Sequence, residues 1–199
     1  MNDVIKTMKE RRSIRKFKKD EVDKNLIREV LEAGRWAPSA KNRQPWKYLV
    51  FTGVKREVML GVMDKGLDMA LEVIPEPAKP AVLDARNTLS IMRGAPVIIL
   101  VLNTNAGSPF KGELDIFSHI TEICDTLSVG ASIENILLKA HCEGLGTVWI
   151  ANTFYAHEPL VSYLKTDAQL AGAIAMGYPD EVPNMRPRKP LDDIVEFMD

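Results

Sequence analysis

Residues 95–103 read APVIILVLN, a run in which nearly every side chain is apolar and several are β-branched. A strand with one solvated face alternates apolar with polar residues, whereas a strand covered on both faces does not. Covering both faces requires other elements above and below the strand. This stretch therefore predicts a central strand in a layered structure of helices and strands.

Three other segments have the composition of strands. Residues 46–52, WKYLVFT, are rich in aromatic and β-branched types, and residues 146–152 and 170–179 are mostly apolar and short. Such residues fit the pleated, half-buried surface of a sheet. Together with residues 95–103, they predict a sheet of four or more strands.

Helices are predicted between these strands. Apolar residues recur at helical spacing from Asp20, which we expect to cap the first turn, to Pro38, which ends the helix. Further helices are expected at 55–71, 82–92 and 122–143, and a short one before the last strand. The helix at 122–143 is apolar almost all round, so it is buried in the core or against another subunit.

The order of these elements predicts a mixed α/β layer structure in a single domain, residues 1–199. The chain has no internal repeat and no Gly/Ser-rich linker. Residues 55–92 are interpreted as a helical excursion from the layered core. Residues 180–199 contain Pro183, Pro187 and Pro190 and are predicted to form an extended tail.

Composition bears on location and partners. The formal net charge is -1, with 46% hydrophobic and 27% charged residues, so overall charge predicts neither a nucleic-acid nor a membrane partner. The longest apolar run is far shorter than the ~20 residues of a membrane-spanning helix. Cys124 and Cys142 fall in one predicted helix, roughly 27 Å apart, and cannot bond to each other. We expect a reduced, cytoplasmic protein.

Basic residues concentrate in two segments. KERRSIRKFKK at residues 9–19 has seven basic residues and one acidic residue, and NMRPRKP at 184–190 has three basic residues. In an extended conformation Arg11, Ser13 and Arg15 project to one side. Guanidinium groups donate paired hydrogen bonds that fit a phosphate or another planar polar acceptor. On charge alone, a solvated basic segment or a nucleic-acid-binding arm is the favoured interpretation.

Several other classes of site are not indicated. The sequence lacks the glycine-rich phosphate loop of NTPases, the G-x-G-x-x-G turn of dinucleotide-binding folds and the G-x-S-x-G elbow of hydrolases. His119, His141 and His157 are scattered without metal-ligand spacing, so no metal site is predicted.

Five motifs together carry a family resemblance. They are RRSIRKF at 11–17, APSAKNRQPWKYLVF at 37–51, GASIENILLKA at 130–140, GLGTVWI at 144–150 and GYPDEVPNMRPRKPLDDIV at 177–195. In this order, over nearly the whole chain, they resemble the FMN-dependent nitroreductase family, and residues 55–93 match it least. The resemblance implies an α+β nitroreductase-like fold: a mostly antiparallel sheet of four to five strands flanked by helices, with the C-terminal tail extending onto a partner subunit.

The resemblance also implies a homodimer that holds FMN at its interface, each FMN contacted by both subunits. One group of residues would hold the phosphate and ribityl chain, from the N-terminal segment and from the tail, and one arginine would reach the pyrimidine edge of the flavin. By motif these are Arg11, Arg12, Ser13, Arg186 and Arg188 for the first role, and Arg15 for the second.

Two further groups are implied around the flavin ring. Residues of the loop after the first predicted helix would line the flavin of the partner subunit, namely Pro38, Ser39, Ala40 and Asn42. Gln44 has two interpretations, a cap for this loop or a hydrogen-bond donor to flavin. Residues at the end of the predicted strand 146–152 would lie along the ring, with a backbone N–H donated to N5: Ile150, Ala151 and Asn152.

Function follows from the resemblance as an expectation. It implies an oxidoreductase that takes hydride from NAD(P)H and passes electrons to a small-molecule acceptor, such as a nitroaromatic or a quinone, in ping-pong order and without a catalytic side chain. Two alternatives remain open: a specialised enzyme of the same fold, either a reductive dehalogenase or a flavin-fragmenting enzyme, and a non-catalytic protein that stores or senses FMN. The lack of a long lid insertion disfavours dehalogenation.

Overall fold

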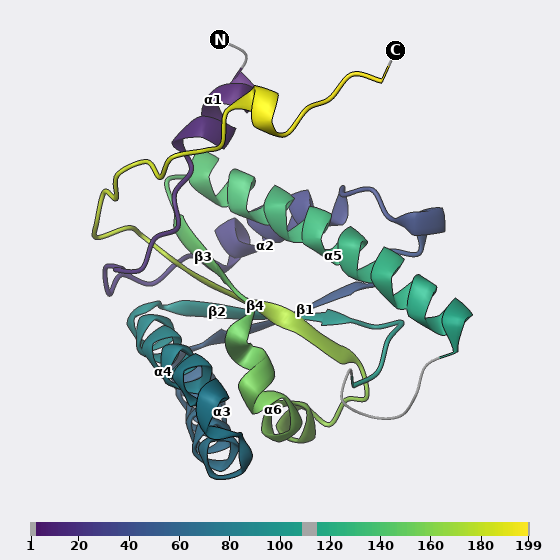
Figure 1. Cartoon of the computed structure of the whole chain (residues 1–199). Helices are drawn as coiled ribbons and strands as arrows, with labels where there is room; N and C mark the ends of the chain where they lie inside the picture. Colours follow the sequence, from purple (N-terminus) through teal and green to yellow (C-terminus); the bar gives the residue numbers. More distant parts are fainter. Residues whose placement is uncertain (1–2, 109–114, 199) are drawn as a thin grey trace.

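The computed structural model describes residues 3–108 and 115–198, and its centre is a four-stranded sheet between two layers of helices (Figure 1). The strands are β1 (Trp46–Thr52), β2 (Val97–Asn103), β3 (Gly146–Ile150) and β4 (Gln169–Gly177). They lie in the order β1-β2-β4-β3, and each neighbouring pair is antiparallel. The predicted mixed α/β layers and antiparallel sheet are confirmed.

Strand β2 has the central role that its sequence predicts. It pairs with β1 on one side and with β4 on the other, and all seven of its residues are buried. Val97, Ile99 and Val101 join the hydrophobic cluster on one face of the sheet, while alternate residues such as Ile98 and Leu100 join the cluster on the other. The uninterrupted apolar run is thus the result of burial on both faces.

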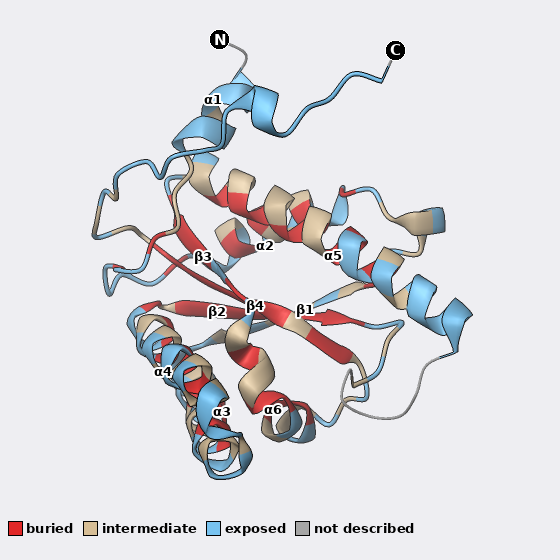
Figure 2. Cartoon of the chain, in the orientation of Figure 1, coloured by how far each residue is buried: buried red, intermediate tan, exposed pale blue. Residues whose placement is uncertain are grey.

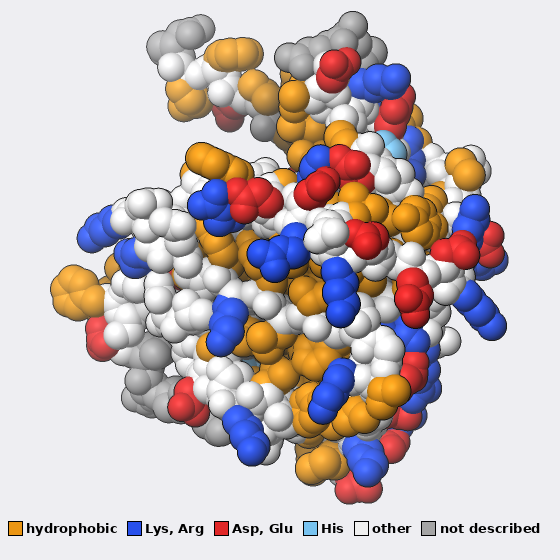
Figure 3. Space-filling model, turned by 180° about the vertical axis from the view of Figure 1, so that it is seen from behind, with side chains coloured by type: hydrophobic (Ala, Val, Ile, Leu, Met, Phe, Trp, Pro, Cys, Tyr) orange, Lys and Arg blue, Asp and Glu red, His pale blue; other side chains and the backbone are white. Residues whose placement is uncertain are grey.

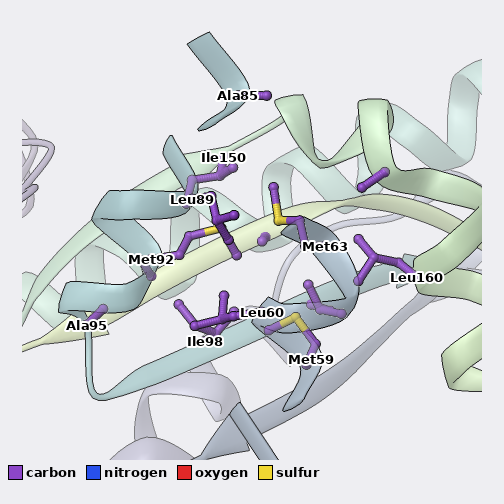
Figure 4. Close-up of a cluster of buried hydrophobic side chains, with 14 of the residues drawn as sticks. Met59, Leu60, Met63, Ala85, Leu89, Met92, Ala95, Ile98, Ile150 and Leu160 are labelled. Atoms are coloured by element: carbon purple, nitrogen blue, oxygen red, sulfur yellow. The ribbon is translucent and has the colours of Figure 1, made fainter. Parts of the chain in front are cut away.

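The two faces are covered by different helices (Figure 1). Helices α2 (Lys24–Arg35) and α5 (Ile116–Cys142) lie on one face, and α3 (Gly53–Val73), α4 (Lys79–Gly94) and α6 (His157–Leu164) lie on the other. Figure 4 shows the second cluster, in which side chains of α3, α4 and α6 meet those of β2 and β3. Buried residues follow the sheet and the inward sides of these helices, whereas α1 and the tail are mostly exposed (Figure 2).

The helices differ from the prediction in several places. Asp23, not Asp20, caps α2, because its carboxylate accepts the N–H groups of Asn25 and Leu26 at 2.8 and 3.3 Å. Helix α5 begins at Ile116 instead of 122, where Asp115 caps it in the same way. Helix α1 (Asp3–Glu10) was not predicted, and none of its residues is buried. Helices α3 and α4 extend the predicted ranges by a few residues at each end.

The tail after β4 is extended, as its prolines predict, except for one short 3-10 turn at Leu191–Asp193. Its first residues pair with the N-terminal segment, since Phe17 bridges Pro179 and the N–H of Asp180 donates to the carbonyl of Lys16 at 2.9 Å. The tail then runs back toward α1 (Figure 1). Segments from the two ends of the chain are thereby brought side by side.

Two smaller expectations concern the helices. Cys124 and Cys142 both lie on α5, as expected, so they are far apart along one axis. Among the helices that the structure describes, none combines the length and the apolar content required to cross a bilayer.

Candidate functional site

A cavity of about 340 Å³ forms where the N-terminal segment meets the tail. Both basic segments of the sequence contribute to it, although they lie at opposite ends of the chain. Its lining contains six cationic side chains and no acidic one, from Lys9, Arg11, Arg12, Arg15, Arg186 and Arg188, together with Ser13 and neighbouring apolar and polar residues. We call this cavity the arginine cradle. It brings together all six residues that the motifs assign to the phosphate, ribityl chain and pyrimidine edge.

Backbone contacts shape the cradle from the inside. The N–H of Ile14 donates to the carbonyl of Thr147 at 2.9 Å, and Ser13 forms a parallel bridge with Thr147, so the N-terminal segment runs alongside β3. Ile14 is buried and packs against Gly146, where an added Cβ would lie 2.8 Å from the Ile14 side chain. Ser13 is therefore held on the opposite side of the segment, at the cavity.

Nearby acidic groups engage the edge of the cradle. Glu134 of α5 lies 3.5 Å from the Nε of Arg11, and a Glu181 carboxylate oxygen accepts the backbone N–H groups of Arg15 and Lys16 at 2.5 and 3.2 Å. The Arg12 guanidinium donates to the carbonyls of Lys9 and Arg11. No carboxylate is paired with Arg186 or Arg188 among the described residues. The cradle thus retains a large excess of positive charge, which suits a doubly charged phosphate.

Strand β3 runs from the cradle to residues 150–152, which the motifs place along the flavin ring. Thr147, which bridges Ser13, and Ile150 lie three residues apart on β3, or roughly 10 Å at strand spacing. Ile150 is buried, Ala151 is exposed, and the Asn152 side chain turns to α4, where its Nδ2 donates to Thr88 Oγ1 at 2.8 Å. The amide N–H of Asn152 is therefore directed at α4, while its Oδ1 is buried without a partner among the described residues.

The third predicted group lies on the loop of residues 38–45, far from the cradle. In Figure 1 this loop, in blue, is on the right, whereas the N-terminal segment and the tail meet on the left. Pro38 and Asn42 are exposed, Ser39 and Ala40 are half-buried, and none of them lines the cradle. One subunit therefore does not bring this group and the cradle together.

Backbone strain marks the same loop. Lys41, Asn42 and Gln44 have φ angles of 52°, 54° and 49°, in the left-handed region that side chains with a Cβ disfavour. Each such residue costs of order 1–2 kcal/mol, less for Asn, and the loop is mostly exposed. The conformation therefore needs contacts from outside the loop to hold it.

The hydrogen bonds of Gln44 support its interpretation as a cap of the loop, and both its backbone and its side chain contribute. Its N–H donates to Ser39 Oγ at 3.0 Å, and its Nε2 donates to Asn42 Oδ1 at 3.2 Å. These bonds close the loop on itself. A hydrogen bond from Gln44 to flavin remains a prediction.

Sequence patterns did not point to several residues that the structure places in the cradle or at the loop of residues 38–45. Lys9 lines the cradle, although its position in the basic run was a usable signal. Arg43 forms an ion pair with the buried Asp125 of α5, and Ser128 Oγ accepts the N–H of Ala40 at 3.1 Å. Nothing in the sequence pairs residues 43 and 125, since that contact depends on how α5 crosses the sheet.

Other classes of site receive no support from the described residues. Over residues 3–108 and 115–198, no three His, Cys, Asp or Glu side chains are grouped so that they could hold a metal ion. On the face shown in Figure 3, Lys and Arg side chains are spread among acidic and hydrophobic ones and form no continuous basic surface.

Comparisons with known proteins agree on one family. The family model described as "Nitroreductase family" matches residues 8–178. A protein of Methanothermobacter thermautotrophicus, provisionally named NADH dehydrogenase/NAD(P)H nitroreductase, is 30% identical over 190 residues, which cover 92% of this chain and 81% of that protein. The 5,6-dimethylbenzimidazole synthase of Rhodospirillum rubrum is 30% identical over 142 residues, which cover 71% of this chain and 65% of that protein.

A solved structure supports the same fold. The crystal structure of a provisionally named nitroreductase from Desulfovibrio desulfuricans, in complex with FMN, superposes with a TM-score of 0.73 at 29% identity. The alignment covers 100% of this chain and 98% of that one. The nitroreductase-like fold predicted from the motifs is confirmed.

Proposed function

The chain belongs to the nitroreductase family, and from that premise we propose that it is an FMN-dependent oxidoreductase that takes hydride from NAD(P)H and reduces nitroaromatics, quinones or similar small electrophiles. The observation that carries this proposal is the arginine cradle: six cationic side chains from the two ends of the chain line one cavity of about 340 Å³. A surplus of guanidinium donors without matching carboxylates is the donor set that a phosphate monoester requires.

The residues present fit FMN in this orientation. Arg11, Arg12, Arg186 and Arg188 would hold the phosphate, and Ser13 would donate to the phosphate or the ribityl chain. The segment runs parallel to β3, so the ring would extend toward residues 150–152, with Arg15 at its pyrimidine edge. Because the Asn152 amide donates to Thr88, a backbone N–H of this turn would be the donor to flavin N5.

Two subunits are required to complete the site. Residues 38–42 lie away from the cradle of their own subunit, so in this proposal they line the flavin of the partner. Exposed apolar residues on α1 and α5 supply a surface for the dimer, among them Met8, Ile120, Ile123 and Leu127. Large exposed apolar areas of this kind favour association.

Bound FMN would supply the hydride acceptor and the electron donor for both half-reactions. The chain's own residues bind the cofactor, fix its face toward the substrate space and hold positive charge at the pyrimidine edge. None of the predicted site residues is a proton-transfer group, so positioning and electrostatics carry the contribution of the protein. One substrate space used in turn by both substrates leads to ping-pong kinetics.

Stopped-flow spectroscopy tests this function directly. Purified protein, reconstituted with FMN, is mixed with NADH or NADPH while flavin absorbance is followed, and the reduced protein is then mixed with a nitroaromatic, a quinone or oxygen. We expect rapid bleaching, reoxidation by one of the first two acceptors, and parallel double-reciprocal lines in steady state. A colourless protein that does not take up FMN would contradict the assignment, as would a flavin that neither nicotinamide reduces.

A flavin-fragmenting activity is the second candidate, because the chain is 30% identical to a 5,6-dimethylbenzimidazole synthase over 142 residues. The two activities differ in what becomes of the flavin. Incubating reduced protein with oxygen and excess reduced FMN, followed by chromatography of the small molecules, shows whether flavin is consumed. Intact FMN after many turnovers supports the reductase, and the appearance of 5,6-dimethylbenzimidazole supports the second candidate. Failure of NAD(P)H to bleach the flavin would instead favour storage or sensing.

A further inference from the structure

The loop of residues 38–45 is attached to α5 by an ion pair that no motif indicated. Arg43 Nε and Nη2 both lie 2.8 Å from Asp125 Oδ1. The Asp125 side chain is completely buried, and that of Arg43 is 26% exposed. We propose that Arg43 and Asp125 are positioning residues, which hold residues 39–42 in the conformation that meets the partner's flavin. This inference rests on the proposed FMN function and extends it to residues outside the cofactor's contacts.

Further hydrogen bonds fix the orientation of the Asp125 carboxylate in the ion pair. Its second carboxylate oxygen, Oδ2, accepts a hydrogen bond from Asn105 Nδ2 at 3.2 Å, just after β2. Asn105 N in turn donates to Asn103 Oδ1 at 3.1 Å. Asn105 thereby holds Oδ2 of the carboxylate from the side of the sheet, and Oδ1 accepts the hydrogen bonds of Arg43. A buried carboxylate held this way has one orientation, which it imposes on the guanidinium.

A second contact fixes the other end of the loop to the same helix. Ser128 Oγ accepts the N–H of Ala40 at 3.1 Å and donates to the carbonyl of Cys124 at 2.7 Å. Asp125 and Ser128 are three residues apart and so lie on one side of α5. Ala40 and Arg43 are also three residues apart. Helix α5 therefore fixes both the position and the conformation of the turn between Ala40 and Arg43.

The strained backbone explains why the turn needs this attachment. Lys41 and Asn42 lie between the two anchored residues, and both have positive φ angles. Within the loop, the N–H groups of Asn42 and Arg43 donate to the carbonyls of Ser39 and Ala40 at 3.0 and 3.1 Å, and Gln44 bonds to Ser39 and Asn42. The contacts with α5 add the support from outside the loop that such strained residues require. Releasing Arg43 lets these residues relax to negative φ and moves Ser39 and Asn42 away from their positions.

A purely structural ion pair would make a different prediction. Its loss would lower the stability of the protein and leave the FMN affinity of the folded protein unchanged. A positioning pair changes the affinity, because its loss displaces the loop residues that contact the flavin and lengthens or breaks their hydrogen bonds. Thermal stability of the apoprotein and FMN affinity must therefore be measured on the same variants.

The variants are chosen to leave a foldable core. The double variant Arg43→Gln/Asp125→Asn removes both charges and keeps a polar side chain at each position, so no buried charge is left unpaired. Arg43→Lys keeps the charge and loses the paired geometry. The matched control is Asp64→Asn, which breaks ion pairs of α3 with Arg86 and Arg93 of α4 on the other face of the sheet.

FMN titration by flavin fluorescence gives the first readout. We expect the FMN Kd of the double variant to rise about ten-fold or more, with a smaller rise for Arg43→Lys and none for Asp64→Asn. Apoprotein Tm is measured on every variant, so that each change in Kd is compared with the change in stability of the same protein. An unchanged Kd in the double variant would overturn the inference. If the wild-type protein itself binds no FMN, the proposed function fails instead.

Mixed dimers show in which subunit the loop acts. A subunit with Arg43→Gln/Asp125→Asn is co-expressed with a subunit carrying Arg186→Ala/Arg188→Ala, and the mixed dimer is isolated by two affinity tags. If the loop serves the partner's flavin, one site combines an intact cradle with an intact loop, and half of the sites recover wild-type affinity. If no site recovers, the loop does not act across the interface and the inference is wrong.

Discussion

Arg15 lies at the rim of the arginine cradle, and a Glu181 oxygen accepts its backbone N–H at 2.5 Å. That bond fixes the backbone of Arg15, while its exposed guanidinium donates only one long hydrogen bond, from Nη1 to the carbonyl of Ser13 at 3.3 Å, and keeps other donors for a ligand. The proposed partner is the pyrimidine edge of the flavin, where negative charge grows on reduction.

Replacing Arg15 tests this electrostatic role. In Arg15→Ala the two-electron reduction potential of bound FMN should fall by about 30–60 mV, because a charge-assisted hydrogen bond of roughly 1.5–3 kcal/mol is lost from the reduced form. Equilibration with a reference dye measures the potential. Arg15→Lys, which keeps a positive charge, should retain part of it, and an unchanged potential together with unchanged FMN affinity would show that Arg15 has no such role.

Arg186 and Arg188 make a separate prediction about ligand preference. If they bind the phosphate, Arg186→Ala/Arg188→Ala should weaken FMN by about ten-fold or more and leave riboflavin, which has no phosphate, nearly unaffected. Competition titrations of the two flavins measure the ratio. An equal loss for both flavins would indicate that the tail acts on the fold and not on the phosphate.

At the scale of elements, α2 and α5 pack so closely that one position excludes any side chain. A Cβ on Gly34 of α2 would lie 2.7 Å from Ile136 Cγ1 and 2.7 Å from Tyr48 Oη. Gly34→Ala should therefore destabilise the protein by about 1–3 kcal/mol through overpacking. Gly61→Ala on α3, where a Cβ meets nothing within 4 Å, is the matched control and should stabilise by about 0.5–1 kcal/mol. Chemical denaturation distinguishes the two.

Tyr48 of β1, which lies in the same layer, makes the stability of the protein depend on pH. Burial raises the pKa of Tyr48 above its usual value of 10.0, while the Ser132 hydroxyl acts weakly in the opposite direction. The unfolded chain thus ionises this phenol first, so its contribution to stability is complete below about pH 10 and declines as the pH rises toward the folded pKa. The free energy of unfolding of the wild type should fall more steeply above pH 10 than that of Tyr48→Phe. Parallel profiles would contradict this.

These elements also show where sequence reasoning stops. The apolar run of β2 and the prolines of the tail determine local structure directly, and both were predicted within a few residues. Helix α1 was missed although Val4, Ile5 and Met8 recur at helical spacing, a signal that could have found it. The arginines of the cradle were found by motif, whereas the pairing of Arg43 with Asp125 depends on tertiary packing that residue spacing does not encode. The assignments of individual site residues, and the single domain over residues 1–199, stay predictions.

At the scale of the whole molecule, apolar side chains remain exposed along α5, including Leu127 with 70% of its surface accessible. The proposed dimer would cover them and bring the loop of residues 38–45 to the second cradle. Assembly and cofactor affinity should consequently change together.

Leu127→Arg tests that coupling. The substitution should convert a dimer to a monomer, because an arginine in an apolar interface cannot be desolvated without a partner, and should raise the FMN Kd by about ten-fold or more. Light scattering after gel filtration measures mass, and fluorescence titration measures affinity. Val54→Arg, at an exposed apolar position on α3, is the control and should change neither. A monomeric variant with unchanged FMN affinity would contradict the shared site.

The cradle has one more consequence, because its walls come from residues 8–15 and residues 183–188. A phosphate held there would join the two ends of the chain as a reversible cross-link, and without it the like charges of the two segments repel each other. Departure of the cofactor would then require the tail to detach. The residence time of FMN would be set by the rate at which an extended polypeptide segment peels away, and a protease that cuts the tail would release the cofactor.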